Sequence, residues 1–523
     1  MVLNALVSVI GKRNANSLRN LVIGAGLIGS HHLSRSSLYF TPGKKNSELV
    51  KPKPGLLDVL SDKDKQSLRD AQSVSKFTIS EEKKVPSTAI SRAAILGSTG
   101  ISIFSSYVFN SVKTKIVGKS EGDGDFVLSP QDADKLASTL CRMRGAALKL
   151  GQTLSIQEDK LIPEVVREAF DKARSFANKM PKSQLDSVMT QSLGENWELK
   201  FESFEDDPFA AASIGQVHKA RLIDGTEVAV KVQYPGVADS IDSDLDSLKT
   251  LISYFNLLPK SFYLDQFIRN TRAELKEECN YEIEADKQMT YKWLINEFGL
   301  GNKYIIPSII PETSSKQIMV SEYKPGLSID DIAAMPSQAI RNYVGHLVME
   351  NTIEELFLMN YMQTDPNLSN YFFDNEQMKL ILLDFGAARR YDKKFCDTYM
   401  GIIQSAANRD RENCFKYSKE LGFLTGEENS KMIEAHFMSL FAVAEPFGFD
   451  GKYDFGSQRI TELVYEYMPS MMKNRLCPPP QEVYSLHRKL SGAYLINIKL
   501  RSQVNVKRIM EEVVQKCKNK DIK

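Results

Sequence analysis

The hydrophobic positions of this chain follow two periods, one typical of strands and one typical of helices. Short β-rich runs predict strands at residues 213–220, 228–233 and 317–322. Between the second and third of these runs, residues 265–298 form a long charged segment with a helical pattern. Together, these patterns predict a small sheet with a helical insertion.

Helical spacing predominates on both sides of this sheet region. Ahead of it, aliphatic residues recur at steps of three and four within residues 130–200. Behind it, helices are expected up to the C-terminus, apart from two strand-like runs at residues 371–373 and 379–383. The predicted fold class is α+β. A small sheet-containing lobe at residues 201–325 would face a larger helical lobe at residues 326–515, with a cleft between them.

The first part of the chain differs from the rest in composition. Residues 1–47 carry six basic residues, many serines and no acidic residue, which is the profile of a transit peptide; an unstructured tail is the alternative. Residues 48–92 are polar and predict a linker. The twenty uncharged residues 93–112 are long enough for a single transmembrane helix. Their seven Ser, Thr and Asn residues suit a buried or surface helix equally well.

Charge and cysteine content limit the classes of function. The 523 residues include 67 Lys and Arg against 66 Asp and Glu, so no net positive field favours nucleic acid as a partner. The six cysteines include no C-x-x-C pair, which argues against a zinc ribbon, a redox pair or a secreted disulfide framework. Reduced thiols inside a cell are the simplest interpretation.

Two motifs of the predicted sheet suit nucleotide phosphates. Lys231 lies within a predicted strand, and a strand lysine can hold phosphates if the strand borders a cleft. Upstream of it, the small residues Ala210, Ala211, Ala212 and Ser213 stand where a kinase carries its glycine-rich loop. Small side chains let a backbone approach phosphates closely. Taken singly, a solvated lysine and a tight turn are the alternatives.

Two later motifs supply oxygen ligands. Asp365 is followed five residues later by Asn370, the catalytic-loop spacing of protein kinases, in which the aspartate faces the phosphoryl acceptor and the asparagine binds a metal ion. Asp384-Phe-Gly directly follows an apolar run, so a strand is expected to end at an aspartate that can hold Mg²⁺ on ATP. Each motif alone also suits an ordinary turn.

The order of these motifs decides between the alternatives. A small-residue loop, a strand lysine, a glutamate-rich helix, Asp-x4-Asn and Asp-Phe-Gly follow one another as the parts of a kinase do. The run 317–322 followed by Lys324-Pro-Gly is similar to a kinase hinge, where backbone groups near Glu322, Tyr323 and Lys324 would contact adenine beside the small gatekeeper Ser321. The sequence therefore predicts a kinase-type ATP site.

One further motif narrows the choice of family. Lys149-Leu-Gly-Gln152 lies in a helical segment before the kinase-like core. Together with residues 210–216, 363–367 and 485–490, it closely resembles the UbiB/ADCK family of atypical kinases, and within it the mitochondrial branch required for coenzyme Q biosynthesis. The resemblance covers roughly residues 130–515.

This resemblance implies an atypical protein-kinase-like two-lobe fold with a family-specific helical extension at residues 130–200. Lys231 would bind the nucleotide, Asp365 would hold the catalytic-loop position, and Asn370 and Asp384 would bind Mg²⁺. The three alanines from Ala210 would form the Ala-rich loop whose substitution for glycines alters nucleotide preference.

The resemblance also implies regulatory residues. The helix of Lys149 and Gln152 would lie over the active site, where a peptide substrate otherwise docks. The family's Glu-x-Asp motif falls on Glu278-Cys-Asn280, in which Asn280 replaces the carboxylate, although Glu278 can still bond Lys149 or the strand lysine. The helix glutamate expected to pair with the strand lysine is Glu284, with Glu278 as its rival.

Three departures from ordinary kinases bear on the reaction. No His-Arg precedes Asp365, Asn367 stands where kinases have a lysine, and no Ala-Pro-Glu follows Asp-Phe-Gly. A platform for a protein substrate is therefore hard to find. The leading hypothesis is a Mg-ATP-binding ATPase required for ubiquinone (coenzyme Q) biosynthesis, coupled to lipid-precursor handling or to organisation of a biosynthetic complex. A small-molecule or protein kinase and a non-catalytic nucleotide-sensing scaffold are the alternatives.

The resemblance and the composition together give expectations for ligands, partners and location. ATP or ADP and Mg²⁺ are the expected cofactors. Coenzyme Q precursors or membrane lipid, other coenzyme Q biosynthesis proteins and a second copy of the chain are the expected partners. The expected location is the matrix side of the mitochondrial inner membrane.

Overall fold

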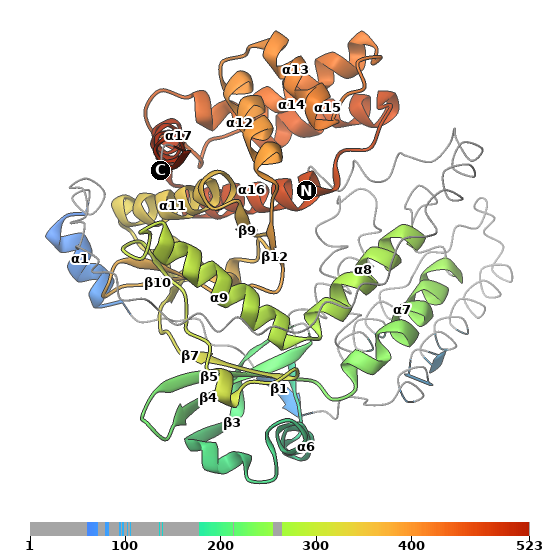
Figure 1. Cartoon of the computed structure of the whole chain (residues 1–523), viewed down its shortest axis with the longest axis vertical. Helices are drawn as coiled ribbons and strands as arrows, with labels where there is room; N and C mark the ends of the chain where they lie inside the picture. Colours follow the sequence, from blue (N-terminus) through green and yellow to red (C-terminus); the bar gives the residue numbers. More distant parts are fainter. Residues whose placement is uncertain are drawn as a thin grey trace, which may run out of the picture.

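The structure is a computed structural model of the whole chain. It describes residues 60–71, 79–82, 177–212, 214–254 and 264–521, together with single positions between residues 91 and 139. Figure 1 shows a sheet at one end of the long axis, the helices α12 to α15 at the other end, and α9, α11 and α16 between them. The predicted α+β architecture with a small and a large lobe is confirmed in this described part.

The small lobe is built on a four-stranded antiparallel sheet. Its strands, in their spatial order, are β3 (Phe201–Ala211), β4 (Gly215–Leu222), β5 (Glu227–Gln233) and β7 (Ile318–Glu322). Alternate residues of β5 are fully buried, which is why its period-two pattern is visible in the sequence. The three predicted strands are confirmed. The edge strand β3 was not predicted, since it carries four acidic residues and its register shifts around Pro208.

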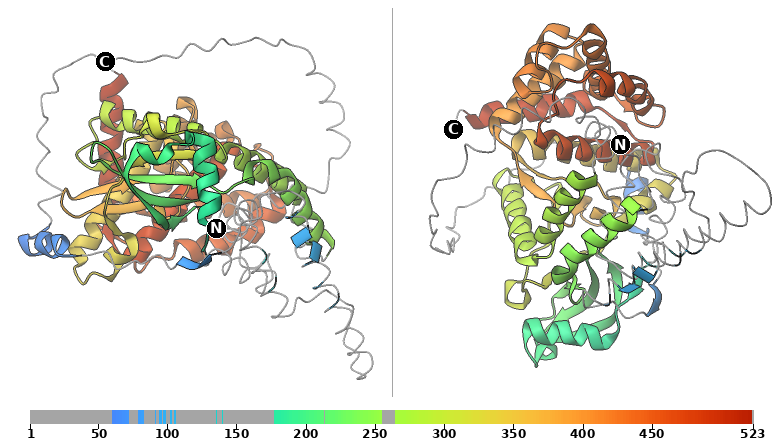
Figure 2. Two further views of the ribbon diagram at one scale, coloured as in Figure 1. Left: turned by 90° about the horizontal axis from the view of Figure 1, so that it is seen from below. Right: turned by 90° about the vertical axis from the view of Figure 1, so that its right-hand side faces the viewer.

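Helices complete the small lobe. They are α6 (Lys182–Leu193), α7 (Val237–Tyr254), α8 (Leu264–Glu278) and α9 (Tyr281–Glu297). Figure 2 shows α6 lying against the sheet. The single helical segment expected at residues 265–298 is two helices, because Asn280 adopts an extended conformation and its side chain caps α9 by accepting the N–H of Glu282.

The large lobe combines a small sheet with a helical body. The sheet order is β6 (Tyr304–Ile305), β11 (Lys379–Leu382), β10 (Tyr371–Asp374), β8 (Leu327–Ser328), and a separate pair joins β9 (Tyr361–Gln363) to β12 (Ala388–Arg390). The helices are α10 (Ile329–Ala334), α11 (Gln338–Ile353), α12 (Lys393–Ala407), α13 (Arg411–Leu421), α14 (Ser430–Gly448), α15 (Ile460–Asn474), α16 (Gln481–Leu500) and α17 (Val506–Asp521). The two strand-like runs near residues 371 and 379 are confirmed. The other strands have only two or three residues, too few for a period to show.

One short helix and two pairs of short strands complete the described part of the chain. The helix α1 (Asp62–Arg69) lies against the large lobe, where the amide of Asn375 donates to the Leu68 carbonyl at 2.9 Å. The strand β1 (Ile79–Glu82) pairs in parallel with β2 (Ala177–Lys179), and β13 (Tyr453–Asp454) pairs with β14 (Gln503–Val504).

Each lobe has its own hydrophobic core. One cluster gathers the inner faces of the small sheet, α6 and α7, and the other surrounds α11, α14 and α16. Two separate cores leave polar side chains free to meet between the lobes. Among the described residues, no helix has the length and apolar character needed to cross a membrane. Residues 1–47 and most of 93–112 and 130–176 lie outside the described residues.

Candidate active site

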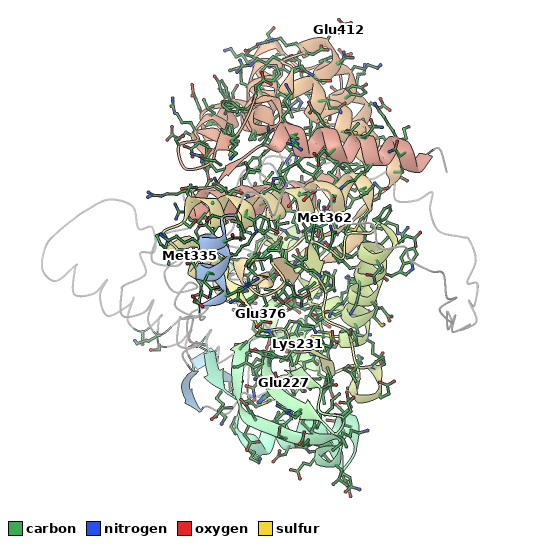
Figure 3. The ribbon with its side chains drawn as sticks, turned by 90° about the vertical axis from the view of Figure 1, so that its left-hand side faces the viewer. Glu227, Lys231, Met335, Met362, Glu376 and Glu412 are labelled. Atoms are coloured by element: carbon green, nitrogen blue, oxygen red, sulfur yellow. The ribbon has the colours of Figure 1, made fainter. Side chains whose placement is uncertain are left out.

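A cavity of about 1590 Å³ lies between the two lobes. Its wall includes all the predicted site residues that the structure describes: Ala210, Ala211, Ala212, Lys231, Glu278, Glu284, Ser321, Glu322, Tyr323, Lys324, Asp365, Asn370 and Asp384. Figure 3 shows Lys231 nearer to the large lobe than Glu227, which begins the same strand. Ser213, Lys149 and Gln152 lie outside the described residues.

The strand lysine is held by a buried carboxylate. Lys231 Nζ donates to both oxygens of Glu284, at 2.7 and 2.9 Å, and lies 3.8 Å from Asp384 Oδ2. Burial by itself lowers the pKa of Lys231, but Asp384 and Glu284 outweigh that effect and raise the pKa above its ordinary value. The lysine therefore remains a cation in contact with two acids. Glu284, on the inward face of α9, fills the expected position, while Glu278 lies on the cavity wall at the end of α8.

The alanine-rich segment is the turn end of a hairpin. Ala210 and Ala211 finish β3 opposite Val217 and Gln216, and the Ala212 N–H donates to the Gly215 carbonyl at 2.9 Å. A Cβ at Gly215 would lie 2.4 Å from the Val232 carbonyl oxygen. This glycine therefore permits close packing of the hairpin on β5, and the alanines form the edge that faces the cavity.

The hinge segment lies at the cavity wall and is held there by hydrogen bonds to neighbouring segments and by an ion pair. The backbone N–H of Ser308 donates to Glu322 Oε2 at 2.9 Å, and Lys324 Nζ lies 3.5 Å from the same carboxylate. The Tyr323 N–H donates to the Glu227 carbonyl at 2.9 Å. The side chain of Glu322 thus stabilises the hinge segment itself.

The catalytic-loop residues are joined directly. Asn370 Nδ2 donates to Asp365 Oδ2 at 3.0 Å. This bond uses the amide nitrogen of Asn370 and does not involve its amide oxygen. Asn367, which stands where kinases have a lysine, accepts the N–H of Ser369 at 3.2 Å and caps the short helix Leu368–Asn370. Its role is local, so it does not replace the missing cation.

The Asp-Phe-Gly segment is clamped at three carbonyls. Asp384 has φ of +57°, a left-handed conformation that is unfavourable for a residue with a side chain. Its carbonyl accepts from Gln363 Nε2 at 3.0 Å, the Gly386 carbonyl from Lys287 Nζ at 2.6 Å, and the Ala387 carbonyl from Thr364 Oγ1 at 2.8 Å. These bonds hold the segment with Asp384 toward the cavity.

Comparison with known proteins tests the family that the motifs predict. Residues 172–418 match the ABC1 atypical kinase-like domain family. A Schizosaccharomyces pombe relative, "Atypical kinase COQ8, mitochondrial", is 41% identical over 83% of this chain and 70% of its own length. The chain belongs to this family of atypical kinases. It is the UbiB/ADCK family that the motifs resemble, in the branch of the COQ8 relatives.

Two further relatives have similar coverage of this atypical kinase. The Saccharomyces cerevisiae protein of the same name is 37% identical over 83% of this chain and 87% of its own length. The Caenorhabditis elegans protein "Atypical kinase coq-8, mitochondrial" is 42% identical over 84% of this chain, which spans 58% of that protein. A solved complex of Rv3197 with erythromycin from Mycobacterium tuberculosis matches with a TM-score of 0.53, at 23% identity, covering 73% of this chain and 96% of that one. This likeness supports the kinase-like fold alone.

Four residues of this atypical kinase's site were missed in the sequence. Lys287, Gln363 and Thr364 bond the Asp-Phe-Gly backbone, and Lys489 bonds Gln363. A signal existed for three of them. Gln363 and Thr364 directly precede Asp365 in the family motif, and Lys287 follows Glu284 by one helical turn. Nothing in the sequence alone places Lys489 behind Gln363.

The donor set suits Mg²⁺ carried by a nucleotide. Asp384 offers a carboxylate and Asn370 an amide oxygen, and Mg²⁺ is usually bound by one or two such groups together with substrate phosphates. Among the described residues, no cluster of three or more His, Cys, Asp and Glu is suited to hold a metal by itself. The residues therefore fit a metal whose remaining ligands come from phosphate and water.

Proposed function

We propose that this protein is a Mg-ATP-dependent ATPase that acts in coenzyme Q biosynthesis. The observation that carries the proposal is the convergence, in one cavity, of the Lys231–Glu284 pair, the Asp365–Asn370 pair and Asp384. These groups come from both lobes, and their order along the chain is that of the parts of a kinase, which supports a role in phosphoryl transfer.

Each residue has a role that follows from its contacts. Lys231, held by Glu284, is available to bind the nucleotide phosphates through the cavity. Asp384 and Asn370 would hold Mg²⁺, which neutralises charge on the phosphates when it is bound. Asp365, oriented by the Asn370 amide, would align the attacking water and accept its proton. The hinge backbone from Glu322 to Lys324 would contact adenine.

The pathway and the location rest on the relatives. The proteins from S. pombe, S. cerevisiae and C. elegans are named mitochondrial COQ8 kinases, and this supports a mitochondrial role in coenzyme Q synthesis. The acid-free, basic segment 1–47 supports import into mitochondria. A place on the matrix side of the inner membrane, contact with lipid or precursor phenols, pairing with a second copy, and association with other proteins of the pathway are parts of the same proposal.

Phosphate release from Mg-ATP tests the proposal. The full chain is assayed alone, with vesicles of inner-membrane lipid composition, and with ubiquinone-precursor phenols. Turnover that rises with lipid or phenol and is lost in Asp365→Asn supports the ATPase. Tight nucleotide binding without turnover under every condition would instead indicate a nucleotide-sensing scaffold.

A small-molecule kinase is the second candidate. The observation in its favour is the cavity of about 1590 Å³, which exceeds the roughly 300–1,000 Å³ of ordinary ligand pockets and leaves room for an acceptor beside a nucleotide. Label from γ-phosphate-labelled ATP appearing on a precursor phenol, and absent with Asp365→Asn, would favour this reaction over hydrolysis.

A further inference from the structure

A second lysine–glutamate pair lies behind the cavity. Lys489 of α16 is 1% exposed, and Glu355 of the π-helical segment Glu354–Leu358 is 0% exposed. Lys489 Nζ lies 2.8 Å from Glu355 Oε2. Neither residue belongs to the described lining of the cavity, so the pair cannot touch a bound nucleotide there. Buried ion pairs add little stability relative to apolar residues of the same size, which raises the question of what this one does.

Gln363 connects the pair to the metal-binding segment. Lys489 Nζ donates to Gln363 Oε1 at 3.3 Å, and the Gln363 backbone N–H donates to Glu355 Oε1 at 3.3 Å. Because the lysine can only donate, it fixes the Gln363 amide with its oxygen toward Lys489. The amide nitrogen then faces the Asp384 carbonyl, to which it donates at 3.0 Å.

Glu355 reaches the same segment by a second route. The Tyr291 hydroxyl donates to Glu355 Oε1 at 2.8 Å and accepts from Asn351 Nδ2 at 2.9 Å. The ring of Tyr291 lies 4.7 Å, between centroids, from that of the fully buried Phe385. The buried pair thus contacts partners that hold both the backbone of Asp384 and the side chain of Phe385.

We propose that Lys489 is a positioning residue: through Glu355 and Gln363 it holds Asp384 in the conformation that presents its carboxylate to Mg²⁺, so that α16 sets the metal affinity of the site. Asp384 has a left-handed φ of +57°, and a residue with a side chain keeps this conformation when its surroundings hold it. The Gln363 bond is one such restraint, and Lys489 orients it. The metal part of this inference rests on the proposed Mg-nucleotide function.

The test uses a variant that removes both charges together. In the full chain, Lys489→Met with Glu355→Gln removes the ion pair without leaving a buried charge unpaired, and the glutamine retains an oxygen for Tyr291 and Gln363. Lys516→Met is the matched control. It removes a lysine 2.7 Å from Glu354, the neighbouring residue of the same π-helical segment, but has no bond to Gln363.

Two measurements separate positioning from a purely structural role. The first is hydrogen exchange of peptides that cover residues 383–388, which is independent of nucleotide. The second is the Mg²⁺ concentration for half-maximal binding of a fluorescent ADP analogue. We expect faster exchange confined to residues 383–388 and a Mg²⁺ requirement raised about tenfold or more, the usual effect of losing a residue that supports a metal ligand. Binding of the analogue without Mg²⁺ and both measurements in Lys516→Met should match the wild type.

Each outcome is decisive. Unchanged exchange at residues 383–388 in the folded double variant overturns the positioning role. Faster exchange with an unchanged Mg²⁺ requirement overturns the link to the metal. If the wild type itself shows no Mg²⁺-dependent binding, the proposed function fails together with the metal link, while the exchange result still decides whether Lys489 holds the segment.

Discussion

The protein contains two buried lysine–glutamate pairs that differ in what surrounds them. Lys231 and Glu284 form part of the cavity wall, with Asp384 as a third charged group 3.8 Å from the lysine. Lys489 and Glu355 lie behind the catalytic loop, enclosed by Gln363, Tyr291 and Tyr371. The same two residue types thus serve a site that a ligand can enter and a site that is closed.

This difference in surroundings determines whether a pair can contribute to ligand binding or only to the positions of neighbouring groups. On a cavity wall, the glutamate can hold the lysine in place while the lysine also bonds a phosphate, so the pair can contribute to ligand binding. A pair enclosed by protein cannot contact a ligand, and its hydrogen bonds can only fix the positions of neighbouring groups. Burial lowers the pKa of Lys489, but Glu355 and Tyr371 outweigh it and raise the pKa to about 12, so the enclosed lysine remains charged.

Removing one lysine from each pair should separate the two roles in stability. Lys489→Met leaves the Glu355 carboxyl group enclosed without its cation, and should lower the free energy of unfolding by about 3–5 kcal/mol. Lys231→Met should cost clearly less, because Glu284 borders the cavity, where water can reach the carboxyl group that has lost its lysine, whereas Glu355 is enclosed by protein. Urea unfolding at pH 7 measures both values. Equal losses in the free energy of unfolding would contradict the proposed difference between the cavity pair and the enclosed pair.

Nucleotide affinity should respond in the opposite order. Lys231→Met removes a charged hydrogen bond to phosphate worth about 1.5–3 kcal/mol, so affinity for Mg-ADP should fall roughly 10- to 100-fold. The double variant of Lys489 and Glu355 should retain Mg-free nucleotide binding, since neither residue reaches the cavity. Calorimetric titration with ADP, with and without Mg²⁺, measures this. A Lys231→Met protein that binds ADP as the wild type does would contradict the proposed role of Lys231.

The sequence was informative where one local pattern carries the structure. The alternation in β5 placed Lys231 on a strand, and the order of the motifs predicted a kinase-type site with its parts in sequence. These signals depend on neighbours in the chain, which a sequence displays directly. The charged edge strand β3 lacks such a pattern, because most of its residues face solvent.

The enclosed pair was beyond prediction for a physical reason. Lys489 meets Gln363 across 126 positions of the chain, and only the packing of α16 on the catalytic loop brings them together. Residues 485–490 carry part of the family resemblance, but a lysine inside a helical pattern is usually solvated, so neither the burial of Lys489 nor its partner could be predicted. The break between α8 and α9 is a milder case, since Asn280 is a good helix cap, but it lies within a long charged run whose helical pattern continues on both sides.

The helix α16, which carries Lys489, also packs closely against the catalytic loop at Gly492. A Cβ at Gly492 would lie 2.1 Å from Cβ of Pro366, the residue after Asp365. Gly492→Ala should therefore push the catalytic loop, lower the free energy of unfolding by about 1–3 kcal/mol and reduce ATP turnover more than ADP affinity. Ser491→Ala, one position earlier on α16, is the control. Normal ATP turnover in Gly492→Ala would show that the catalytic loop can shift without affecting the reaction.

The acid of the cavity pair should make binding depend on pH. Burial raises the pKa of Glu284 to about 7 although Lys231 opposes this, so its carboxylate takes up a proton as the pH falls from 8 to 6. The protonated acid holds Lys231 less firmly, and affinity for ADP should therefore fall toward acid pH. Glu284→Gln is neutral throughout, so the ratio of wild-type to variant affinity isolates this titration from that of ADP. We expect the ratio to shrink up to about tenfold between pH 8 and pH 6, corresponding to one pKa unit of interaction. A ratio that is constant with pH would mean that Glu284 does not titrate in this range, and that the cavity pair is as fixed in charge as the enclosed one.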